Sequence, residues 1–188
     1  MKKLLLLGIA IFIMGCSNNS TQNVAQSTQI SKGGNTGLPQ WVLMPEVEGA
    51  TAAVGSAKIG KAGIQFARNQ ALLAARAELA RTVEIKVKDL TKNYTNVVGV
   101  GDQETVEMVA SNVSKSVANQ SLKGSKQMDI FISPTNELYV LVAVPNAELK
   151  EEIKSDFINE LQSEAKLYQE FKADQGFKEL DAEIEKSL

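Results

Sequence analysis

Apolar side chains recur three, four or seven positions apart between Ile64 and about Val97, and this spacing predicts one long helix. Several alanines lie close to the apolar stripe, where small side chains let a helix approach a sheet closely; alanine is also the strongest helix former. Gly99 and Gly101 end the pattern. The stripe consists of Leu72, Leu79, Val83, Leu90, Tyr94 and Val97, and the alanines beside it are Ala67, Ala71, Ala74 and Ala75.

A second helix is predicted after Asp102, whose side chain is of the type that caps a helix N-terminus. Glu104 in the first turn would favour the helix dipole. Valine, serine and asparagine are only moderate helix formers, so this helix is expected to need tertiary support. Its buried face is marked by Val106, Val109, Val113 and Val117.

Alternating apolar and polar residues at 125–144, interrupted by Ser-Pro-Thr-Asn, predict a β-hairpin. Met128, Ile130 and Ile132 share one face of its first strand. A short apolar segment at 52–59 predicts a third strand. The pattern therefore predicts an α+β fold, in which a small three-stranded antiparallel sheet packs against the long helix, with a second helix and a long C-terminal helical arm.

Residues 38–146 are expected to form the core domain and to fold alone. The single tryptophan, Trp41, follows Pro39 near the start of this domain. We interpret Trp41 as an anchor that buries apolar area rather than as a ligand-stacking side chain. The expected core contains Trp41, Leu72, Leu79, Val83, Ile130, Val140 and Val142.

The remaining residues, 147–188, are predicted to form an acidic amphipathic helical arm, with Pro145 ending the strand and Asn146 capping the helix. From Glu148 onward there are twelve acidic and six basic residues, a net charge of −6, whereas the chain from Cys16 to this point carries +2. Opposite charges would favour docking of the arm, either on its own domain or, as a scaffold role requires, on a neighbouring copy. The two edges of the sheet are further candidate contacts. The apolar positions of the arm are Leu149, Ile153, Phe157, Leu161, Tyr168 and Phe171, followed after Gly176 by Phe177, Leu180, Ile184 and Leu188.

Two lysines and an apolar run of about a dozen residues at the N-terminus have the pattern of a signal peptide, assigned to residues 1–15. As a helix this run would reach about 18 Å, too short for a hydrocarbon core of about 30 Å. Ile13-Met14-Gly15-Cys16 resembles the lipobox of bacterial lipoproteins, in which the cysteine is acylated, palmitate included, and becomes the mature N-terminus. The other interpretation is an ordinary signal peptide with an incidental thiol.

Residues 16–37 follow as a polar tether, rich in Ser, Asn, Gln, Thr and Gly. The flexible residues of such a tether span roughly 25 Å root-mean-square. Ser17 directly after the cysteine resembles the outer-membrane address of enteric lipoproteins.

The amino-acid composition excludes several classes of catalytic and metal-binding site. Of 188 residues, 44% are hydrophobic and 22% charged, which is typical of a globular domain. The chain has no histidine and one cysteine, which excludes histidine-based catalysis, histidine metal sites, an intramolecular disulfide and thiolate clusters. With a pI near 5.4 it carries no general basic field for nucleic acid.

Gly55 to Lys61 match the phosphate-binding pattern G-x-x-x-x-G-K between a predicted strand and a predicted helix. The next residue is Ala62, which lacks the hydroxyl that would hold Mg²⁺. We therefore interpret the segment as a glycine-rich connection and expect no nucleotide and no other cofactor.

Two clusters of charged residues are further candidates for ligand binding. Asp102, Glu104 and Glu107 lack the loop glycine and spacing of a calcium loop, so we expect dipole-stabilising carboxylates and no metal. The basic residues on the first helix are interpreted as a solvated face in preference to a contact with anionic lipid. They are Arg81, Lys86, Lys88 and Lys92.

An entry segment with Pro39, Trp41 and Val42 precedes the motifs at 54–57, 69–71, 75–80 and 139–142. This order of features resembles the LPP20-like outer-membrane lipoprotein family, including its flagellar P-type branch, over roughly 38–146. The resemblance implies a non-enzymatic lipoprotein, with Cys16 as the one functional position that carries over. The flagellar branch implies a structural component of a disk or ring; other branches imply a surface-exposed adhesin or ligand-binding lipoprotein. A hydrolase with an unrecognised carboxylate site is a further alternative.

Overall fold

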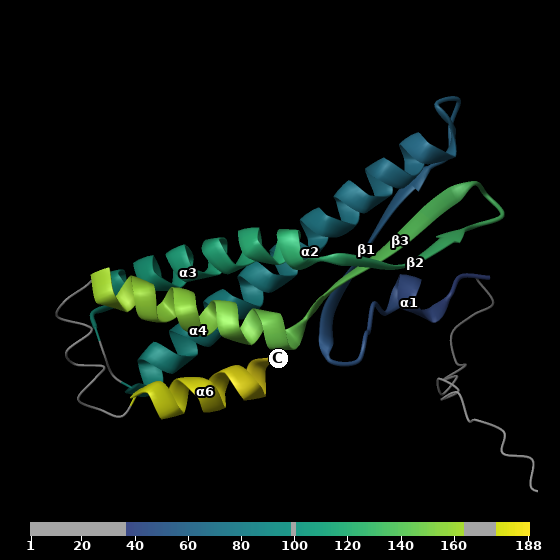
Figure 1. Cartoon of the computed structure of the whole chain (residues 1–188). Coiled ribbons are helices and arrows are strands. Elements are labelled where there is room, and N and C mark those ends of the chain that lie inside the picture. The colour runs from purple at the N-terminus through teal and green to yellow at the C-terminus, as the bar shows by residue number, and fades with distance from the viewer. Residues whose placement is uncertain (1–36, 99–100, 164–175) are drawn as a thin grey trace, which may run out of the picture. The chain divides into compact units, whose positions relative to one another are not determined.

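The computed structural model describes residues 37–98, 101–163 and 176–188, and the side chains of these ranges except 96–98 and 176–177. One compact unit, Asn35–Leu188, has the expected α+β fold (Figure 1). The elements are α1 (Gln40–Leu43), β1 (Ala50–Lys58), α2 (Gly63–Val98), α3 (Gln103–Gly124), β2 (Lys126–Ile132), β3 (Glu137–Pro145), α4 (Asn146–Ser163) and α6 (Gly176–Ser187). The expected apolar positions Val97, Tyr168, Phe171 and Phe177 fall outside the described side chains.

The sheet is antiparallel with the strand order β1-β3-β2, which confirms the predicted hairpin and the third strand. The central strand β3 pairs with both neighbours, so that Val140 lies between Gly55 of β1 and Ile130 of β2. The hairpin turn closes at Asn136, whose φ of 59° is one that asparagine tolerates better than most residues.

Helix α2 serves two layers of the fold because its buried face turns as the helix proceeds. Buried positions recur every fourth residue, and each step of four overshoots the 3.6-residue repeat by about 40°. The face that packs on the sheet therefore rotates gradually into the face that packs on other helices. Small side chains occupy the start of this series and larger ones the end: Ala67, Ala71, Ala75, Leu79, Val83 and Val87.

Beyond the sheet, α2 packs with α3, α4 and α6 in a helical bundle (Figure 1). The ring of Tyr94 from α2 meets the ring of Phe157 from α4 edge-to-face, with centroids 5.4 Å apart and planes at 84°. Side chains of α4 and α6 belong to the same buried cluster as the sheet residues. The boundary expected after residue 146 therefore does not separate two cores.

The C-terminal arm folds back onto its own chain. Leu180 and Ile184 of α6 are buried, with exposures of 0% and 3%, and α6 contacts both α2 and α4. The expectation that these apolar side chains dock on a neighbouring copy is corrected accordingly. Removing α6 would uncover part of the core, so truncation is expected to lower the stability of the core rather than to leave it unchanged.

Asn146 has a different role from the predicted helix cap. Its side-chain carbonyl accepts a hydrogen bond from the Thr51 hydroxyl at 3.0 Å, and its amide donates to the Leu188 carbonyl at 2.9 Å. One side chain thus joins β1, the start of α4 and the C-terminus.

The expected core contained three residues that the structure does not fully bury: Trp41, Leu72, which is partly buried against the core, and Ile130. Ile130 is 39% exposed because α2 lies over β1 and β3 and leaves the edge strand β2 uncovered. A bulge between Gln127 and Asp129 also breaks the expected common face of β2. Trp41 is half-buried in α1, which packs against β3.

Candidate functional site

The candidate phosphate loop is part of the sheet. Gly55 to Lys58 lie inside β1, so the first half of the motif is extended strand and does not wrap around a ligand. Gly55 instead lies directly beneath α2, where a Cβ would be 2.1 Å from the Ala75 nitrogen and 2.4 Å from the Ala71 oxygen. Glycine is needed here because a helix backbone occupies the space of a side chain.

Asp102 caps α3, as predicted. Its carboxylate accepts hydrogen bonds from the Thr105 backbone N–H at 2.9 Å and from the Thr105 hydroxyl at 3.0 Å. These bonds hold the pKa of Asp102 below its usual value. Among the described residues, no three or more Cys, Asp or Glu side chains are arranged to hold a metal ion.

The third carboxylate of the predicted acidic cluster, Glu107, joins two helices. It forms ion pairs with Lys92 and, at 3.8 Å, with Lys88 on α2. The hydrogen bond from Lys92 lowers the pKa of Glu107. Arg81 pairs with Glu78 on its own helix. Most of the predicted basic face therefore has carboxylate partners in the same chain.

Lysines of the acidic arm form ion pairs with carboxylates of the same arm, between α4 and α6. Lys150 of α4 lies 2.5 Å from Glu185 of α6, and Lys154 lies 2.8 Å from Asp181. These pairs are half-exposed, so each adds little stability, yet both require α6 to run beside α4. The lysines of the arm itself, rather than a separate basic surface, meet these carboxylates.

A carboxylate that the sequence pattern did not single out lies in the contact between α3 and α4. Burial, together with the charges of Asp156 and Glu148, raises the pKa of Glu152, while Lys123 opposes the shift. One carboxylate oxygen of Glu152 is buried without a hydrogen-bond partner. Asp156 beside it accepts a hydrogen bond from Gln120 of α3 at 2.9 Å. The raised pKa of Glu152 thus follows first from its burial between packed helices.

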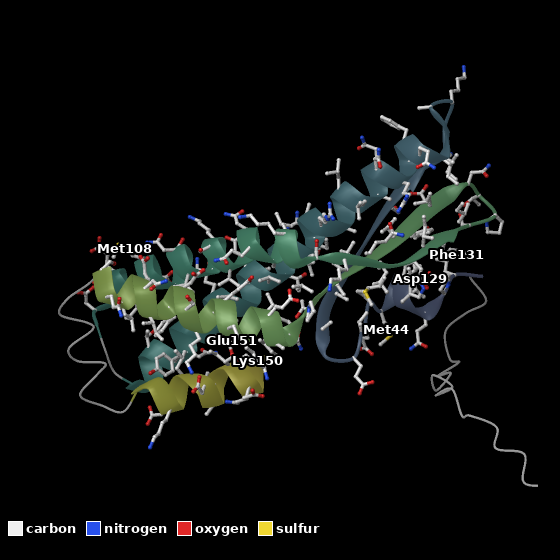
Figure 2. The ribbon with its side chains drawn as sticks, in the orientation of Figure 1. Met44, Met108, Asp129, Phe131, Lys150 and Glu151 are labelled. Carbon is white, nitrogen blue, oxygen red and sulfur yellow. The ribbon has the colours of Figure 1, made fainter. Side chains whose placement is uncertain are left out.

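Exposed apolar side chains gather in one half of the molecule. We call residues 37–80 and 125–145 the sheet half, and the other described residues the bundle half. Of the ten large hydrophobic side chains that are exposed among described residues, eight belong to the sheet half. Figure 2 shows Met44 at the end of α1 and Phe131 on β2 in this half, with Met108 at the far end of the bundle. The eight are Leu43, Met44, Ile64, Phe66, Leu73, Met128, Ile130 and Ile132, and the other two are Ile85 and Met108.

The predicted lipidation site lies outside the described residues. The signal peptide at 1–15, Cys16 and all but the last residue of the tether are not described, so they stay predictions. The tether joins the fold at Gly37, three residues before α1 begins. In the part of the chain that the structure describes, none of the helices has the length and apolar character needed to cross a bilayer.

A comparison with protein-family models matches residues 39–145, more than half of the chain, to the LPP20 lipoprotein family. A search of curated proteins finds no match. The matched segment extends from the residue before α1 to the last residue of β3 and so includes the whole sheet with α2 and α3. This chain belongs to the LPP20 lipoprotein family.

Proposed function

We propose that this protein is a non-enzymatic outer-membrane lipoprotein that acts as a structural or assembly component of the envelope. It would be anchored through acylated Cys16 and would associate with further copies or with another envelope protein. A flagellum-associated disk or ring is the specific assembly that the resemblance favours. Membership of a lipoprotein family supports the anchor.

A structural role is supported by the contacts that the candidate phosphate-binding and metal-binding residues make within the fold. Gly55 gives α2 room to approach the sheet, and Asp102 caps α3. Glu107 links α2 to α3 through Lys92, and Lys154 links α4 to α6 through Asp181. Gly55, Asp102 and Glu107, which the sequence offered as candidates for phosphate or metal binding, thus make contacts that hold the domain together.

The anchor is tested by replacing the acceptor cysteine. Cys16→Ser is expected to release the protein from the membrane fraction or to leave an uncleaved precursor, because no other thiol is available for acylation. Ser17→Ala serves as the matched control, since it alters the neighbouring residue and keeps the thiol. Identical fractionation and processing of the Cys16 variant and the wild type would contradict the lipoprotein assignment.

The assembly role is tested by sedimentation of the acylated protein in mild detergent and by cross-linking in cells. Recovery of a discrete oligomer or of one envelope partner is the expected result. A strictly monomeric protein at high concentration with no cross-linked partner would refute it.

A surface-exposed adhesin is the second candidate. Phe66 favours it, since this aromatic side chain is 55% exposed on α2. Protease treatment of intact cells separates the two functions, because an adhesin must be accessible from outside.

A further inference from the structure

We propose that the sheet half of the folded unit contacts the lipid bilayer directly, through α1 and the edge strand β2. This inference rests on the proposed function, because it takes the acylated Cys16 as given. The exposed apolar side chains of α1 and β2 would thus contact the bilayer surface, while the acyl chains on Cys16 anchor the tether in the same bilayer.

The first observation is the placement of exposed apolar side chains on two adjoining elements. Leu43 and Met44 at the end of α1 are 61% and 53% exposed. On β2, Met128, Ile130 and Ile132 are 53%, 39% and 42% exposed. Helix α1 contacts β3, the strand next to β2, so both groups lie near the β2 edge of the sheet, with Ile130 on the face that α2 covers over β1 and β3. Exposed apolar groupings of this kind mark protein or membrane contacts.

The second observation is the position of the anchor. The tether enters the fold at Gly37, so the residues nearest the acylated end of the chain are those of α1. A flexible segment of about twenty residues has a root-mean-square span of roughly 25 Å. In the proposed acylated protein, a tether of this span would keep Leu43 and Met44 near the bilayer and so raise their effective concentration at its surface.

The third observation is the distribution of charge. The sheet half contains five basic and five acidic residues and is electrically neutral. The described bundle half contains ten basic and fourteen acidic residues, a net charge of −4. An anionic headgroup surface repels the bundle half and leaves the neutral, apolar half as the one that can approach.

Features of β2 disfavour the competing occupant, a strand from a second copy. The strand is bulged between Gln127 and Asp129 and carries the charged residues Lys126 and Asp129. The Asp129 carboxylate already accepts the Ile130 backbone N–H at 2.7 Å. Bulges and edge charges are the devices by which proteins prevent strand addition. Insertion of side chains among lipid headgroups does not require unpaired backbone N–H and C=O groups on β2, so the bulge and the edge charges do not prevent it.

Trp41 provides the test, because it is the single tryptophan and lies in α1. The acylated mature protein is reconstituted in vesicles of phosphatidylethanolamine and phosphatidylglycerol whose acyl chains carry bromine, a short-range quencher of indole fluorescence. The expected result is strong quenching of Trp41 relative to unbrominated vesicles. The combined variant Leu43→Ser, Met44→Ser and Met128→Ser should lose most of this quenching.

The matched control is the combined variant Ile85→Ser and Met108→Ser, which removes exposed apolar side chains from the bundle half and should keep full quenching. Far-ultraviolet circular dichroism checks that both variants fold. Equal Trp41 fluorescence in brominated and unbrominated vesicles would overturn the proposal, as would an equal loss of quenching in both variants. A change of oligomer size in detergent, seen only for the sheet-half variant and without vesicle quenching, would assign the surface to a second copy and also overturn it.

Failure of the anchor is distinguished by fractionation. If Cys16 carries no acyl group, the protein does not enter the vesicles, and the proposed function fails. If the acylated protein is retained in the vesicles while Trp41 is not quenched, the lipoprotein assignment stands and the bilayer contact alone is wrong.

Discussion

The contact between Gly55 and α2 makes the sharpest stability prediction. A Cβ added at Gly55 would lie 2.1 Å from the Ala75 nitrogen, 2.4 Å from the Ala71 oxygen and 2.8 Å from the Ala74 carbonyl carbon. All three are backbone atoms, so no side chain can change its rotamer to make room. Non-bonded heavy atoms prefer separations of about 3.5–4.0 Å, so Gly55→Ala must push α2 from β1 by more than about an ångström.

The cost of this displacement exceeds that of ordinary overpacking. Extra methyl groups in a packed core typically cost about 1–3 kcal/mol, when side chains can partly adjust. The gain from restricting the unfolded chain by a Gly→Ala change is only about 0.4–1 kcal/mol. Because the obstruction is helix backbone, we expect Gly55→Ala to lower the free energy of unfolding by about 3 kcal/mol, or to prevent folding. Domains of this kind have about 5–15 kcal/mol in total, so the loss is a large fraction.

Urea unfolding followed by circular dichroism measures the effect. The matched control is Gly60→Ala, because a Cβ at Gly60 meets nothing within 4 Å and its backbone is not left-handed. The control should leave the midpoint unchanged or raise it slightly. If Gly55→Ala lost less than about 1 kcal/mol, the lower end of the overpacking range, the close approach of α2 to the sheet would be refuted.

Two further predictions concern the core and its pH dependence. Leu79→Ala and Leu180→Ala remove fully buried side chains from α2 and α6. Each substitution should lower the free energy of unfolding, measured in urea, by about 2–5 kcal/mol. A negligible loss for Leu180→Ala would mean that α6 does not pack as described. Burial raises the pKa of Glu152 above its unfolded value, so the folded state holds this proton more tightly, and stability falls as the pH rises from the unfolded pKa through the folded one. Glu152→Gln should therefore raise the melting temperature at neutral pH, and this gain should disappear in acid below the unfolded pKa. Glu151→Gln, on the exposed face of α4, should change the melting temperature little at either pH. An equal gain from Glu152→Gln at neutral and at acid pH would contradict the assigned cause.

The long helix shows what periodicity predicts well and what it leaves out. The small side chains at Ala67, Ala71 and Ala75 correctly predicted a close contact between helix and sheet. The partner of that contact, Gly55, could not be identified, because the pairing depends on the register in which β1 lies beneath α2. From the sequence alone, the first glycine of a G-x-x-x-x-G-K pattern fits a phosphate-binding loop as well as a strand packed beneath a helix.

Strand β2 shows a different limit. Alternation at Met128, Ile130 and Ile132 correctly predicted a strand but assigned a shared buried face. Whether a face of a strand is buried depends on how far the covering helix extends across the sheet. Helix α2 packs over β1 and β3, and it reaches β2 through the exposed Arg68 side chain, which donates hydrogen bonds to Gln127. Asp129 in the middle of the strand was the available signal, since a charge among alternating apolar residues is characteristic of an uncovered edge.

The C-terminal arm shows that amphipathic spacing and charge balance do not specify a partner. Leu180 and Ile184 were correctly predicted to need an apolar surface, but the surface lies along α2 and α4 of the same chain. Lys150 and Lys154 illustrate why the charge balance misleads, because their charges are included in the net −6 of the arm and yet pair locally with Glu185 and Asp181. A net charge conceals such internal pairing. With α6 occupied in this way, an assembly that uses this fold must rely on surfaces other than the apolar face of the arm.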